Sequence, residues 1–452
     1  MRKTIKEIAE WLNIDAGEYE STYVTGVSID TRTIKEGDLF IPFRGETTNG
    51  HKFVSQAFEK GASCSLWLKD EPNPPKGVPI LFVEDCENAL QLMAQKYRAE
   101  LQSKFIGVTG SNGKTSTKDI LASLLSPFYK VQKTIGNFNN ELGLPITILS
   151  LDEDTEIAVL ELGMSSFGEI EFLSKLAKPH YAVITNIGEA HMQDLGSREG
   201  IAKAKFEIIQ GLDSEGILFY DGDEPLLKAL VEAENHLKSK SFGFHTKNHL
   251  SIQEIEMTEK GSRFVVNGEL EGEFSIPILG KHQVKNSLSA MLVAKSLGLS
   301  EAEIRQGLEQ VSLTDMRMQP LLLNGILFIN DAYNAAPTSM KAAIEFVKST
   351  SMRKDKWLIL GDMLELGEDE QHFHEQMAEH IDDSINRICL FGPRMKWLYD
   401  KLVSKYNDRI MYTENQHEEI VHYIKKHASE ESLILLKGSR GMKLEKILEE
   451  FK

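Results

Sequence analysis

Two series of apolar runs, each followed by polar or glycine-rich turns and helical segments, recur along the chain. The first series lies at 105–109, 157–162, 181–186 and 217–220. The second series lies at 326–330, 357–361, 388–391 and 433–436. Continuous apolar runs of this length are typical of parallel strands that are buried on both faces of a sheet. The pattern therefore predicts an α/β fold with two mainly parallel sheets, the second of them in a separate doubly wound unit.

The first hundred residues follow a different pattern. Short apolar runs at 38–42 and 78–83 predict strands, and the proline-rich segment 71–77 predicts a loop because proline fixes φ and removes a backbone donor. Within 88–101, apolar residues recur every three or four positions, which predicts one amphipathic helix. We expect three domains: a small N-terminal mixed α/β domain at 1–100, a central domain at 101–312 and a C-terminal domain at 313–452.

The composition favours a globular protein that binds no nucleic acid and does not span a membrane. Lys and Arg number 51 against 68 Asp and Glu, and the resulting formal charge of -17 disfavours a surface that neutralises nucleic-acid phosphates. Cys64, Cys86 and Cys389 form no Cys-x-x-Cys pair, so the sequence predicts neither a disulfide framework nor a thiolate zinc site. No apolar run approaches the roughly 18 residues of a membrane span, and the N-terminus has no run of signal-peptide length. We therefore expect a cytoplasmic protein.

A glycine-rich turn at 105–117 is the strongest local signal for chemistry, because it joins a predicted strand to a predicted helix. Gly110 and Gly113 allow backbone N–H groups to surround an anion, Lys114 adds a full positive charge, and the Thr115 hydroxyl can reach Mg²⁺. The predicted nucleotide contacts in this turn are Gly110, Ser111, Asn112, Gly113, Lys114, Thr115 and Ser116.

The turn departs from the strict phosphate-loop spacing, since Val108 stands where the first glycine belongs. The order of strand, turn and helix is nevertheless the expected one, and we favour nucleotide binding over the alternative of a purely structural turn. GTP-binding proteins usually carry an Asn-Lys-x-Asp guanine reader, and the sequence contains no Asn-Lys dipeptide. ATP is therefore the predicted nucleotide.

Two polar residues at strand ends are candidate metal ligands. Glu161 closes the run at 157–162, and His191 follows the run at 181–186. Each alone could be an ordinary strand cap or loop residue. Because the carboxyl ends of parallel strands share one edge of a sheet, both side chains could converge on the metal that Thr115 helps to hold.

Lys205 interrupts an otherwise apolar helical face. Ile201, Ile208, Ile209 and Leu212 share that face with Lys205, and a bare ammonium among them would be costly unless it is paired or chemically changed. One alternative is a side chain that extends its ammonium to water at the rim of the face. The other is carboxylation by CO₂, which would convert Lys205 into an anion able to stabilise a second Mg²⁺.

Ordered sequence blocks over nearly the whole chain resemble the Mur ligase superfamily. The blocks lie at 28–32, 37–40, 109–115, 136–145, 161–165, 185–191, 280–286, 331–337, 361–367 and 437–440. The blocks at 137–141, 362–367 and 437–440 resemble the dipeptide-adding branch more than its relatives.

The resemblance implies an N-terminal domain that holds a UDP-sugar, a central ATPase domain with the phosphate loop, and a C-terminal Rossmann-like domain that closes over the site. It implies an ATP-dependent ligase that joins D-alanyl-D-alanine to UDP-N-acetylmuramoyl-tripeptide through an acyl phosphate, and we expect it to act as a monomer. Two alternatives with similar chemistry remain open, another amino-acid-adding Mur ligase and a folylpolyglutamate synthetase. A third, of a different class, is a non-catalytic protein switched by a nucleotide.

The resemblance also implies roles for individual residues. The catalytic set consists of Lys114, Glu161, His191, Lys205 and Arg317. Thr115, Glu161 and His191 would serve two Mg²⁺ ions, and Lys205 matches the lysine that is carboxylated in several members. His282 and Asn286 would lie near the adenine, Arg317 near the phosphates and Asp331 near the ribose. The expected sugar-nucleotide contacts are Ser28, Thr31, Arg32, Arg44, Asn137, Asn139 and Asn140. The expected dipeptide contacts are Asn334, Lys437, Ser439 and Arg440.

Overall fold

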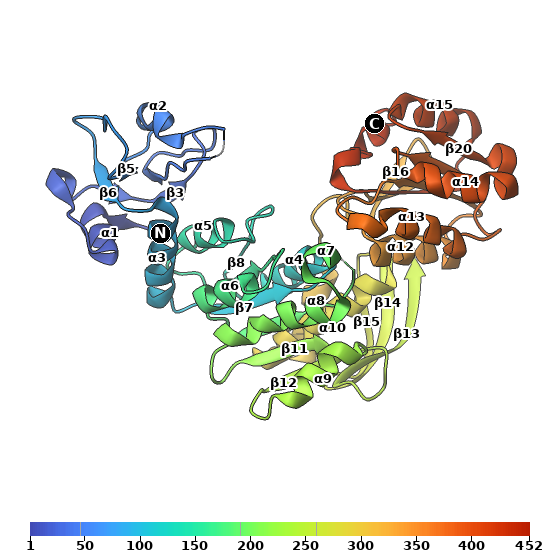
Figure 1. Ribbon diagram of the computed structural model, residues 1–452. Helices are drawn as coiled ribbons and strands as arrows, with labels where there is room; N and C mark the ends of the chain where they lie inside the picture. The colour runs from blue at the N-terminus through green and yellow to red at the C-terminus, as the bar shows by residue number, and fades with distance from the viewer. Residues whose placement is uncertain (46, 190, 259) are drawn as a thin grey trace.

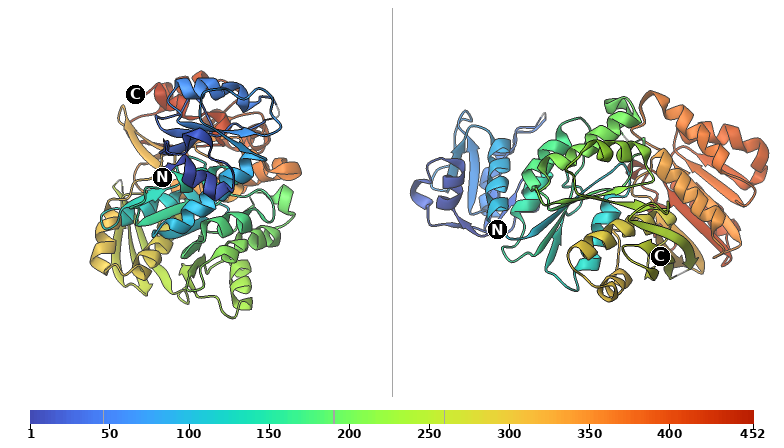
Figure 2. Two further views of the ribbon diagram at one scale, coloured as in Figure 1. Left: turned by 90° about the vertical axis from the view of Figure 1, so that its left-hand side faces the viewer. Right: turned by 90° about the horizontal axis from the view of Figure 1, so that it is seen from below.

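The computed structural model describes residues 1–45, 47–189, 191–258 and 260–452. Three bodies, each built around its own sheet, follow one another along the chain (Figure 1). The view from below in Figure 2 shows the central body between the N-terminal body in blue and the C-terminal body in orange and red. None of the helices in the described ranges is both long and apolar enough to cross a membrane.

The N-terminal body contains a parallel four-stranded sheet and a short antiparallel pair. Its strands are β1 (Lys3–Thr4), β2 (Tyr23–Val24), β3 (Gly26–Ser28), β4 (Asp38–Phe40), β5 (Cys64–Leu68) and β6 (Ile80–Val83). Its helices are α1 (Ile5–Leu12), η1 (Gly17–Tyr19), η2 (Gly50–Phe53), α2 (Val54–Glu59) and α3 (Cys86–Glu100). Helix α3 begins two residues before the predicted start, because the Asp85 side chain accepts a hydrogen bond from the Asn88 N–H and caps the first turn.

The central body contains a nine-stranded sheet in the order β15-β14-β13-β12-β11-β10-β7-β9-β8. Its strands are β7 (Lys104–Thr109), β8 (Val131–Lys133), β9 (Ile157–Glu161), β10 (Tyr181–Ile184), β11 (Ile217–Asp221), β12 (Ser239–Gly243), β13 (Leu250–Thr258), β14 (Gly261–Gly268) and β15 (Gly272–Ile276). The strands from β8 to β13 pair in parallel, whereas β14 and β15 extend the sheet as an antiparallel meander. The mainly parallel sheet expected here is confirmed, with an antiparallel edge that the apolar runs did not predict.

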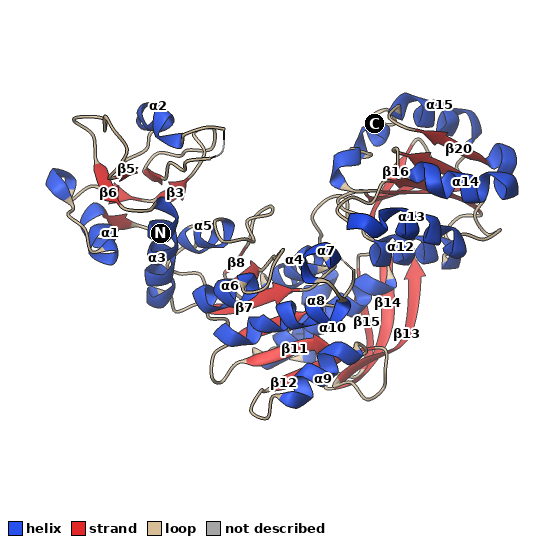
Figure 3. Cartoon of the chain, viewed as in Figure 1, coloured by secondary structure: helices blue, strands red, loops and turns tan. Residues whose placement is uncertain are grey.

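Helices cover both faces of the central sheet (Figure 3). They are α4 (Lys114–Leu125), α5 (Gly143–Leu149), α6 (Glu169–Ala177), α7 (Met192–Leu195), α8 (Arg198–Phe206), η3 (Glu207–Gly211), α9 (Pro225–Ala233), α10 (Lys281–Ser296) and α11 (Glu301–Glu309). Side chains of α4, α10 and α11 share one hydrophobic core with the sheet, and those of α5, α6, α8 and α9 share another. Successive residues of β7 alternate between them, because Phe105 packs in the second core and Ile106 in the first.

The C-terminal body is a doubly wound sheet in the order β16-β17-β21-β18-β19-β20. Its strands are β16 (Gln319–Leu323), β17 (Ile326–Asp331), β18 (Asp355–Gly361), β19 (Arg387–Phe391), β20 (Ile410–Thr413) and β21 (Ser432–Lys437). Its helices are α12 (Pro337–Ser349), η4 (Gly367–Asp369), α13 (Glu370–Gln376), η5 (Met377–His380), α14 (Met395–Tyr406), η6 (Asn407–Arg409), α15 (His417–His427), η7 (Arg440–Met442) and α16 (Glu445–Glu449). All pairs are parallel except the edge pair of β16 and β17. The predicted α/β fold class is confirmed, while the predicted boundaries at 100 and 312 remain a proposal.

Candidate functional site

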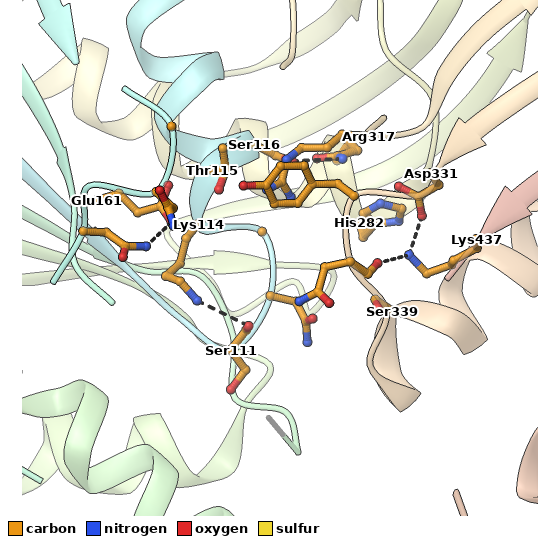
Figure 4. A pocket seen from close by; sticks show the side chains of 18 of the residues that line it. Ser111, Lys114, Thr115, Ser116, Glu161, His282, Arg317, Asp331, Ser339 and Lys437 are labelled. Atoms are coloured by element: carbon orange, nitrogen blue, oxygen red, sulfur yellow. Dashed lines mark hydrogen bonds and ion pairs between the residues drawn. The ribbon is translucent and has the colours of Figure 1, made fainter. Parts of the chain in front are cut away.

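A cavity of about 440 Å³ lies between the central and C-terminal bodies, where the carboxyl ends of their strands meet (Figure 4). Many of the predicted site residues line it. These are Ser111, Asn112, Gly113, Lys114, Thr115, Ser116, Asn137, Asn139, Glu161, His282, Arg317, Asp331, Asn334 and Lys437. Other predicted residues lie outside its lining. These are Ser28, Thr31, Arg32, Arg44, Gly110, Asn140, His191, Lys205, Asn286, Ser439 and Arg440.

The phosphate loop runs from the end of β7 into α4, and two of its positions require glycine. Gly113 has a φ of +81°, and a Cβ there would lie 2.8 Å from Nδ2 of Asn286. Gly110 has a φ of +149°, and a Cβ there would lie 1.9 Å from the Thr185 hydroxyl oxygen. Asn286 therefore packs against the loop at Gly113 and supports its shape.

Lys114 opens helix α4 and folds back across the loop. Its Nζ donates a hydrogen bond of 2.7 Å to the Gly110 carbonyl oxygen. Burial lowers the pKa of Lys114 from its ordinary value, although the nearby Glu161 carboxylate opposes that shift. The ammonium group thus lies at the cavity and forms no ion pair with the described residues. It can therefore bind an anionic ligand.

Several buried polar atoms on or beside the cavity have no hydrogen-bond partner in the described part of the chain. In the lining of the cavity they are Ser111 Oγ, Asn112 Nδ2, Glu161 Oε2 and Arg317 Nε. Because buried polar groups in folded proteins are nearly always hydrogen-bonded, such a concentration around one cavity indicates a polar ligand.

The Glu161 carboxylate has one oxygen engaged and one oxygen free. Asn139 Nδ2 donates a hydrogen bond of 2.9 Å to Oε1, whereas Oε2 accepts none, and the nearest cation is Lys118 Nζ at 3.7 Å. Thr115 lines the same cavity. No group of three His, Cys, Asp or Glu side chains within the described ranges could hold a metal by itself. One carboxylate and one hydroxyl beside a phosphate loop fit Mg²⁺, which is usually bound by one or two carboxylates together with phosphate and water oxygens.

His191 and Lys205 lie outside the cavity lining but close enough to Lys114 for its charge to act on both. Burial lowers the pKa of His191 to about 4, and the positive charges of Lys205 and Lys114 act in the same direction. Lys205 is 1% exposed, so its ammonium does not reach water as one of the two alternatives required. Helix α8 also ends at Phe206, so the continuous helical face expected up to Leu212 is replaced by a 3₁₀ turn.

Lys205 is a buried lysine without a counter-charge. No carboxylate of the described residues lies within ion-pair distance of it, and burial lowers its pKa well below the usual range. The neighbouring positive charge of Lys114 acts in the same direction. The structure therefore favours the neutral amine, which is the form of lysine that reacts with CO₂.

Arg317 enters the cavity from the connection between α11 and β16. Its guanidinium group lies 4.1 Å from the centre of the Tyr333 ring, and both residues line the cavity. Met316 and Met318 on either side of it have φ values of +63° and +52°. Left-handed backbone is uncommon for side chains of this size, so the connection holds Arg317 in a specific, strained conformation.

The remaining cavity residues form a hydrogen-bonded group on the C-terminal side. Lys437 Nζ donates hydrogen bonds to Asp331 Oδ2 at 2.6 Å and to the Asn334 carbonyl oxygen at 3.2 Å. The other Asp331 oxygen accepts a hydrogen bond from the Met318 N–H. Burial lowers the pKa of His282 to about 4, against the opposing effect of Asp331. His282 is therefore neutral at physiological pH.

Two residues expected at the dipeptide have internal partners. The Ser439 hydroxyl accepts a hydrogen bond of 2.9 Å from the Leu364 N–H. Arg440 forms an ion pair of 2.6 Å with Glu445. Asn140 likewise caps a helix, since its side-chain oxygen accepts a hydrogen bond of 2.9 Å from the Gly143 N–H at the start of α5.

The expected sugar-nucleotide residues of the N-terminal body also have local partners. The Ser28 hydroxyl donates to the Asp30 carbonyl oxygen, and Arg32 pairs with the Asp30 carboxylate at 2.6 Å. Thr31 donates to Gln56. Arg44 is held by Asp70 and Glu71, each at 2.8 Å. Strand β3, which carries Ser28, packs against α5, the helix that follows the loop carrying Asn137 and Asn139.

Sequence reasoning missed several residues of the site. Tyr333, Ser339 and Glu365 line the cavity, although Tyr333 and Glu365 fall within the sequence blocks at 331–337 and 361–367. Lys118, which approaches Glu161, was missed altogether. Its position three residues after Thr115 places both side chains on one face of α4, and that spacing was a usable signal.

Comparison with known proteins assigns the chain to a family. Residues 23–98 match the description "Mur ligase family, catalytic domain", residues 108–294 match "Mur ligase middle domain", and residues 316–440 match "Mur ligase, glutamate ligase domain". The UDP-N-acetylmuramoyl-tripeptide–D-alanyl-D-alanine ligase of Bacillus subtilis (strain 168) is 46% identical over 456 residues, which cover 100% of this chain and 98% of that protein.

Solved structures agree with this assignment. A crystal structure of MurF from Acinetobacter baumannii is 28% identical and superposes with a TM-score of 0.89, covering 100% of this chain and 99% of that one. The MurF ligase of Thermotoga maritima, solved in complex with ADP, is 27% identical with a TM-score of 0.84, covering 95% of this chain and 97% of that one. With family matches in all three bodies and a relative aligned end to end, this chain belongs to the Mur ligase family.

Proposed function

We propose that the chain is an ATP-dependent ligase that joins D-alanyl-D-alanine to UDP-N-acetylmuramoyl-tripeptide and releases ADP and phosphate. The observation that carries this proposal is a single cavity in which the phosphate loop with Lys114 faces the free oxygen of Glu161 and the guanidinium group of Arg317. The full-length similarity to the Bacillus subtilis ligase favours these substrates over those of other Mur ligases or of a folylpolyglutamate synthetase. The ADP complex of the Thermotoga maritima enzyme supports ATP as the nucleotide.

The chemistry requires activation of the tripeptide carboxylate. A carboxylate cannot form an amide directly, because oxide would have to leave. Attack of a carboxylate oxygen on the γ-phosphorus of ATP forms an acyl phosphate and releases ADP. The dipeptide amine then forms the C–N bond, phosphate leaves with the former carboxylate oxygen, and the amine loses its proton to solvent.

Lys114 and Arg317 make the first step feasible. The carboxylate and the triphosphate are both anions, and their repulsion in a partly dehydrated cavity is large. Two cations in the lining of the cavity would reduce this repulsion and stabilise the charge that develops on the transferred phosphoryl group. The neutral ring of His282 adds no charge there and is suited to contact with the adenine.

Thr115 and Glu161 would hold Mg²⁺ beside the phosphates. The bound ion would neutralise phosphate oxygens and fix their geometry. Lys205, once carboxylated on its neutral amine, would present an anion and, together with His191, support a second Mg²⁺.

The other predicted contacts complete the proposal. Asn137 and Asn139 approach the cavity from the central body, and Ser28, Thr31, Arg32 and Arg44 remain the proposed contacts of the UDP-sugar. Asn334 and Lys437 remain the proposed dipeptide contacts inside the cavity, with Ser439 and Arg440 just beyond it. The three free cysteines fit a reducing cytoplasm as the compartment of the reaction, and we propose a monomer as the active form.

A substrate-omission assay tests the proposal. The purified protein is incubated with ATP, Mg²⁺, UDP-N-acetylmuramoyl-tripeptide and D-alanyl-D-alanine, and both ADP and the coupled product are followed. We expect product only in the complete mixture and ADP in equal amount. ADP formation that is unchanged when the tripeptide or the dipeptide is omitted would contradict the ligase. Nucleotide binding without any turnover would favour a nucleotide-switched binding protein instead.

A further inference from the structure

A group of charged side chains that includes two buried residues of α4 adjoins the cavity at Glu161. Lys118 and Asp119, both on α4, are 2% and 0% exposed. Lys118 Nζ lies 3.7 Å from Glu161 Oε2 and 3.8 Å from Asp119 Oδ1. Lys133, at the end of β8, donates a hydrogen bond of 2.6 Å to the same Asp119 oxygen. One continuous network of charged side chains therefore links Glu161 in the cavity to Lys118 and Asp119 on α4.

The second oxygen of Asp119 extends this network to the C-terminal body. Asp119 Oδ2 accepts hydrogen bonds from the Thr314 N–H at 2.9 Å and from the Thr314 hydroxyl at 2.7 Å. Thr314 lies on the connection between α11 and β16, three residues before Arg317. The Asp119 carboxylate thus makes the shorter contacts between the phosphate-loop helix and the connection that holds Arg317, and Ser123 on the same helix makes longer ones, of 3.4 Å, with the Ser312 backbone.

Stability alone does not account for such a network. Removing charged groups from water is costly, and well-packed apolar side chains of similar size often stabilise a fold as well or better. The network also leaves Glu161 Oε2 without a hydrogen bond, which a structural role would not require. One end of the network is instead Glu161, which our proposed function assigns to Mg²⁺, and the other is Thr314, three residues before the proposed phosphate contact Arg317.

We propose that Lys118 and Asp119 are positioning residues for the ligase reaction. Lys118 orients the Glu161 carboxylate toward the Mg²⁺ position, and Asp119 fixes Thr314 and thereby the position of Arg317. The inference rests on the proposed function, because the two ends matter together only if a magnesium nucleotide lies between them.

Lys118→Met tests whether Lys118 orients the Glu161 carboxylate. The change keeps an unbranched side chain but removes the charge beside Glu161. We expect the Mg²⁺ concentration for half-maximal activity to rise about tenfold, as is typical when the partner of a metal-binding side chain is removed. Binding of Mn²⁺ in the presence of ADP, followed by its paramagnetic resonance signal, should weaken similarly without any turnover. In a Glu161→Gln background, Lys118→Met should have little further effect.

Lys285→Met is the matched control for Lys118. Lys285 lies on α10 of the same body and pairs with Asp221 and Asp223 at 2.7 and 3.2 Å, outside the cavity lining. This variant should lose stability but keep the wild-type dependence on Mg²⁺ and the wild-type affinity for Mn²⁺. Equal effects of Lys118→Met and Lys285→Met on Mn²⁺ binding would overturn the role of Lys118.

Thr314→Val tests whether Asp119 positions Arg317 through Thr314. The change leaves every charge in place. It removes the hydroxyl hydrogen bond to Asp119, and we expect kcat to fall about fivefold with a smaller change in KM for the tripeptide. In an Arg317→Ala background the same change should have almost no effect, because the position of Arg317 no longer matters. Thr155→Val, which removes the hydroxyl hydrogen bond of a threonine elsewhere in the central body, is the control and should leave kcat unchanged.

The outcomes separate this inference from the proposed function. An inactive wild-type protein in the complete assay would contradict the function itself. With an active wild-type protein, effects of Thr314→Val and Arg317→Ala that multiply independently would overturn the role of Asp119. If Lys118→Met does not fold, Lys118→Gln repeats the Mn²⁺ measurement, and wild-type Mn²⁺ affinity in that variant would overturn the role of Lys118.

Discussion

Lys114 is the residue on which the nucleotide site depends most. Its ammonium group donates hydrogen bonds to two carbonyl oxygens of the phosphate loop, those of Gly110 at 2.7 Å and Ser111 at 3.5 Å. We predict that Lys114→Ala lowers kcat about 10³-fold or more, because the positive charge is lost where the transferred phosphoryl group gains charge. Circular dichroism and the melting temperature should stay close to the wild type. Near-full activity of this variant would contradict the assignment of the phosphate loop.

The buried amine of Lys205 leads to a prediction about CO₂. Removal of CO₂ from the buffer should lower activity, and added bicarbonate should restore it. Lys205→Ala should be nearly inactive and partly rescued by short carboxylic acids, which can occupy the position of the carbamate. Lys203→Ala, an exposed lysine on the same helix α8, is the matched control and should behave as the wild type does in both treatments. If neither bicarbonate nor the acids have any effect, Lys205 acts as an unmodified lysine.

His282 makes stability depend on pH in a defined direction. Its pKa is about 4 in the folded protein, against 6.5 as the ordinary value, so between these values the unfolded chain binds more protons. Stability should therefore fall as the pH is lowered from about 6.5 to about 4. Between pH 6.5 and pH 4, the free energy of unfolding measured with urea should decrease by about 2 kcal/mol less in His282→Asn than in the wild type. An identical loss in both proteins would mean that His282 is not buried in its neutral form.

At the scale of single elements, the phosphate loop depends on its glycine at the start of α4. Gly113→Ala places a methyl group 2.8 Å from Asn286 on a backbone with a φ of +81°. We expect ATP binding to weaken about tenfold, measured by calorimetry, because the loop must shift. Gly298→Ala is the control, since φ there is +96° but a Cβ would meet open space. Equal ATP affinity in both variants would show that the shape of the loop is unimportant.

The elements that the sequence predicted well are those whose burial is complete on both faces. The strands β7, β9 and β18 were predictable because short, continuous apolar runs bounded by turns are typical of strands buried in a parallel sheet. The antiparallel strands β14 and β15 were missed, because their half-buried residues give a weaker pattern. The end of α8 at Phe206 could not be predicted, since the 3₁₀ turn after it continues the helical spacing of apolar residues.

Without the family resemblance, the site was most predictable where one short segment carries its chemistry. The turn at 109–115 has such a signal, whereas the pairing of Lys437 with Asp331 joins residues that are far apart in sequence. Left-handed backbone at Met316 and Met318 likewise has no sequence signal, although it holds Arg317 in place. Side-chain partners of this kind are decided by how the bodies pack, which local patterns do not encode.

At the scale of the whole molecule, the cavity exists only because two bodies meet. Lys114 and Glu161 come from the central body, and Asp331 and Lys437 come from the C-terminal body. The Thr338 hydroxyl also donates a hydrogen bond to Glu189 between the two bodies. A site divided in this way can exclude water from a reactive acyl phosphate when the bodies are together and release products when they separate. The reaction is therefore a property of the assembled chain.

The transfer of oxygen from the tripeptide carboxylate to phosphate reveals whether an acyl phosphate forms. The tripeptide is prepared with heavy-isotope oxygen in the carboxylate that reacts, and the phosphate released in the complete reaction is examined by mass spectrometry. An acyl phosphate intermediate predicts that each phosphate carries one labelled oxygen, because the carboxylate oxygen leaves with phosphorus. Unlabelled phosphate, formed at the same rate as the amide product, would contradict the account.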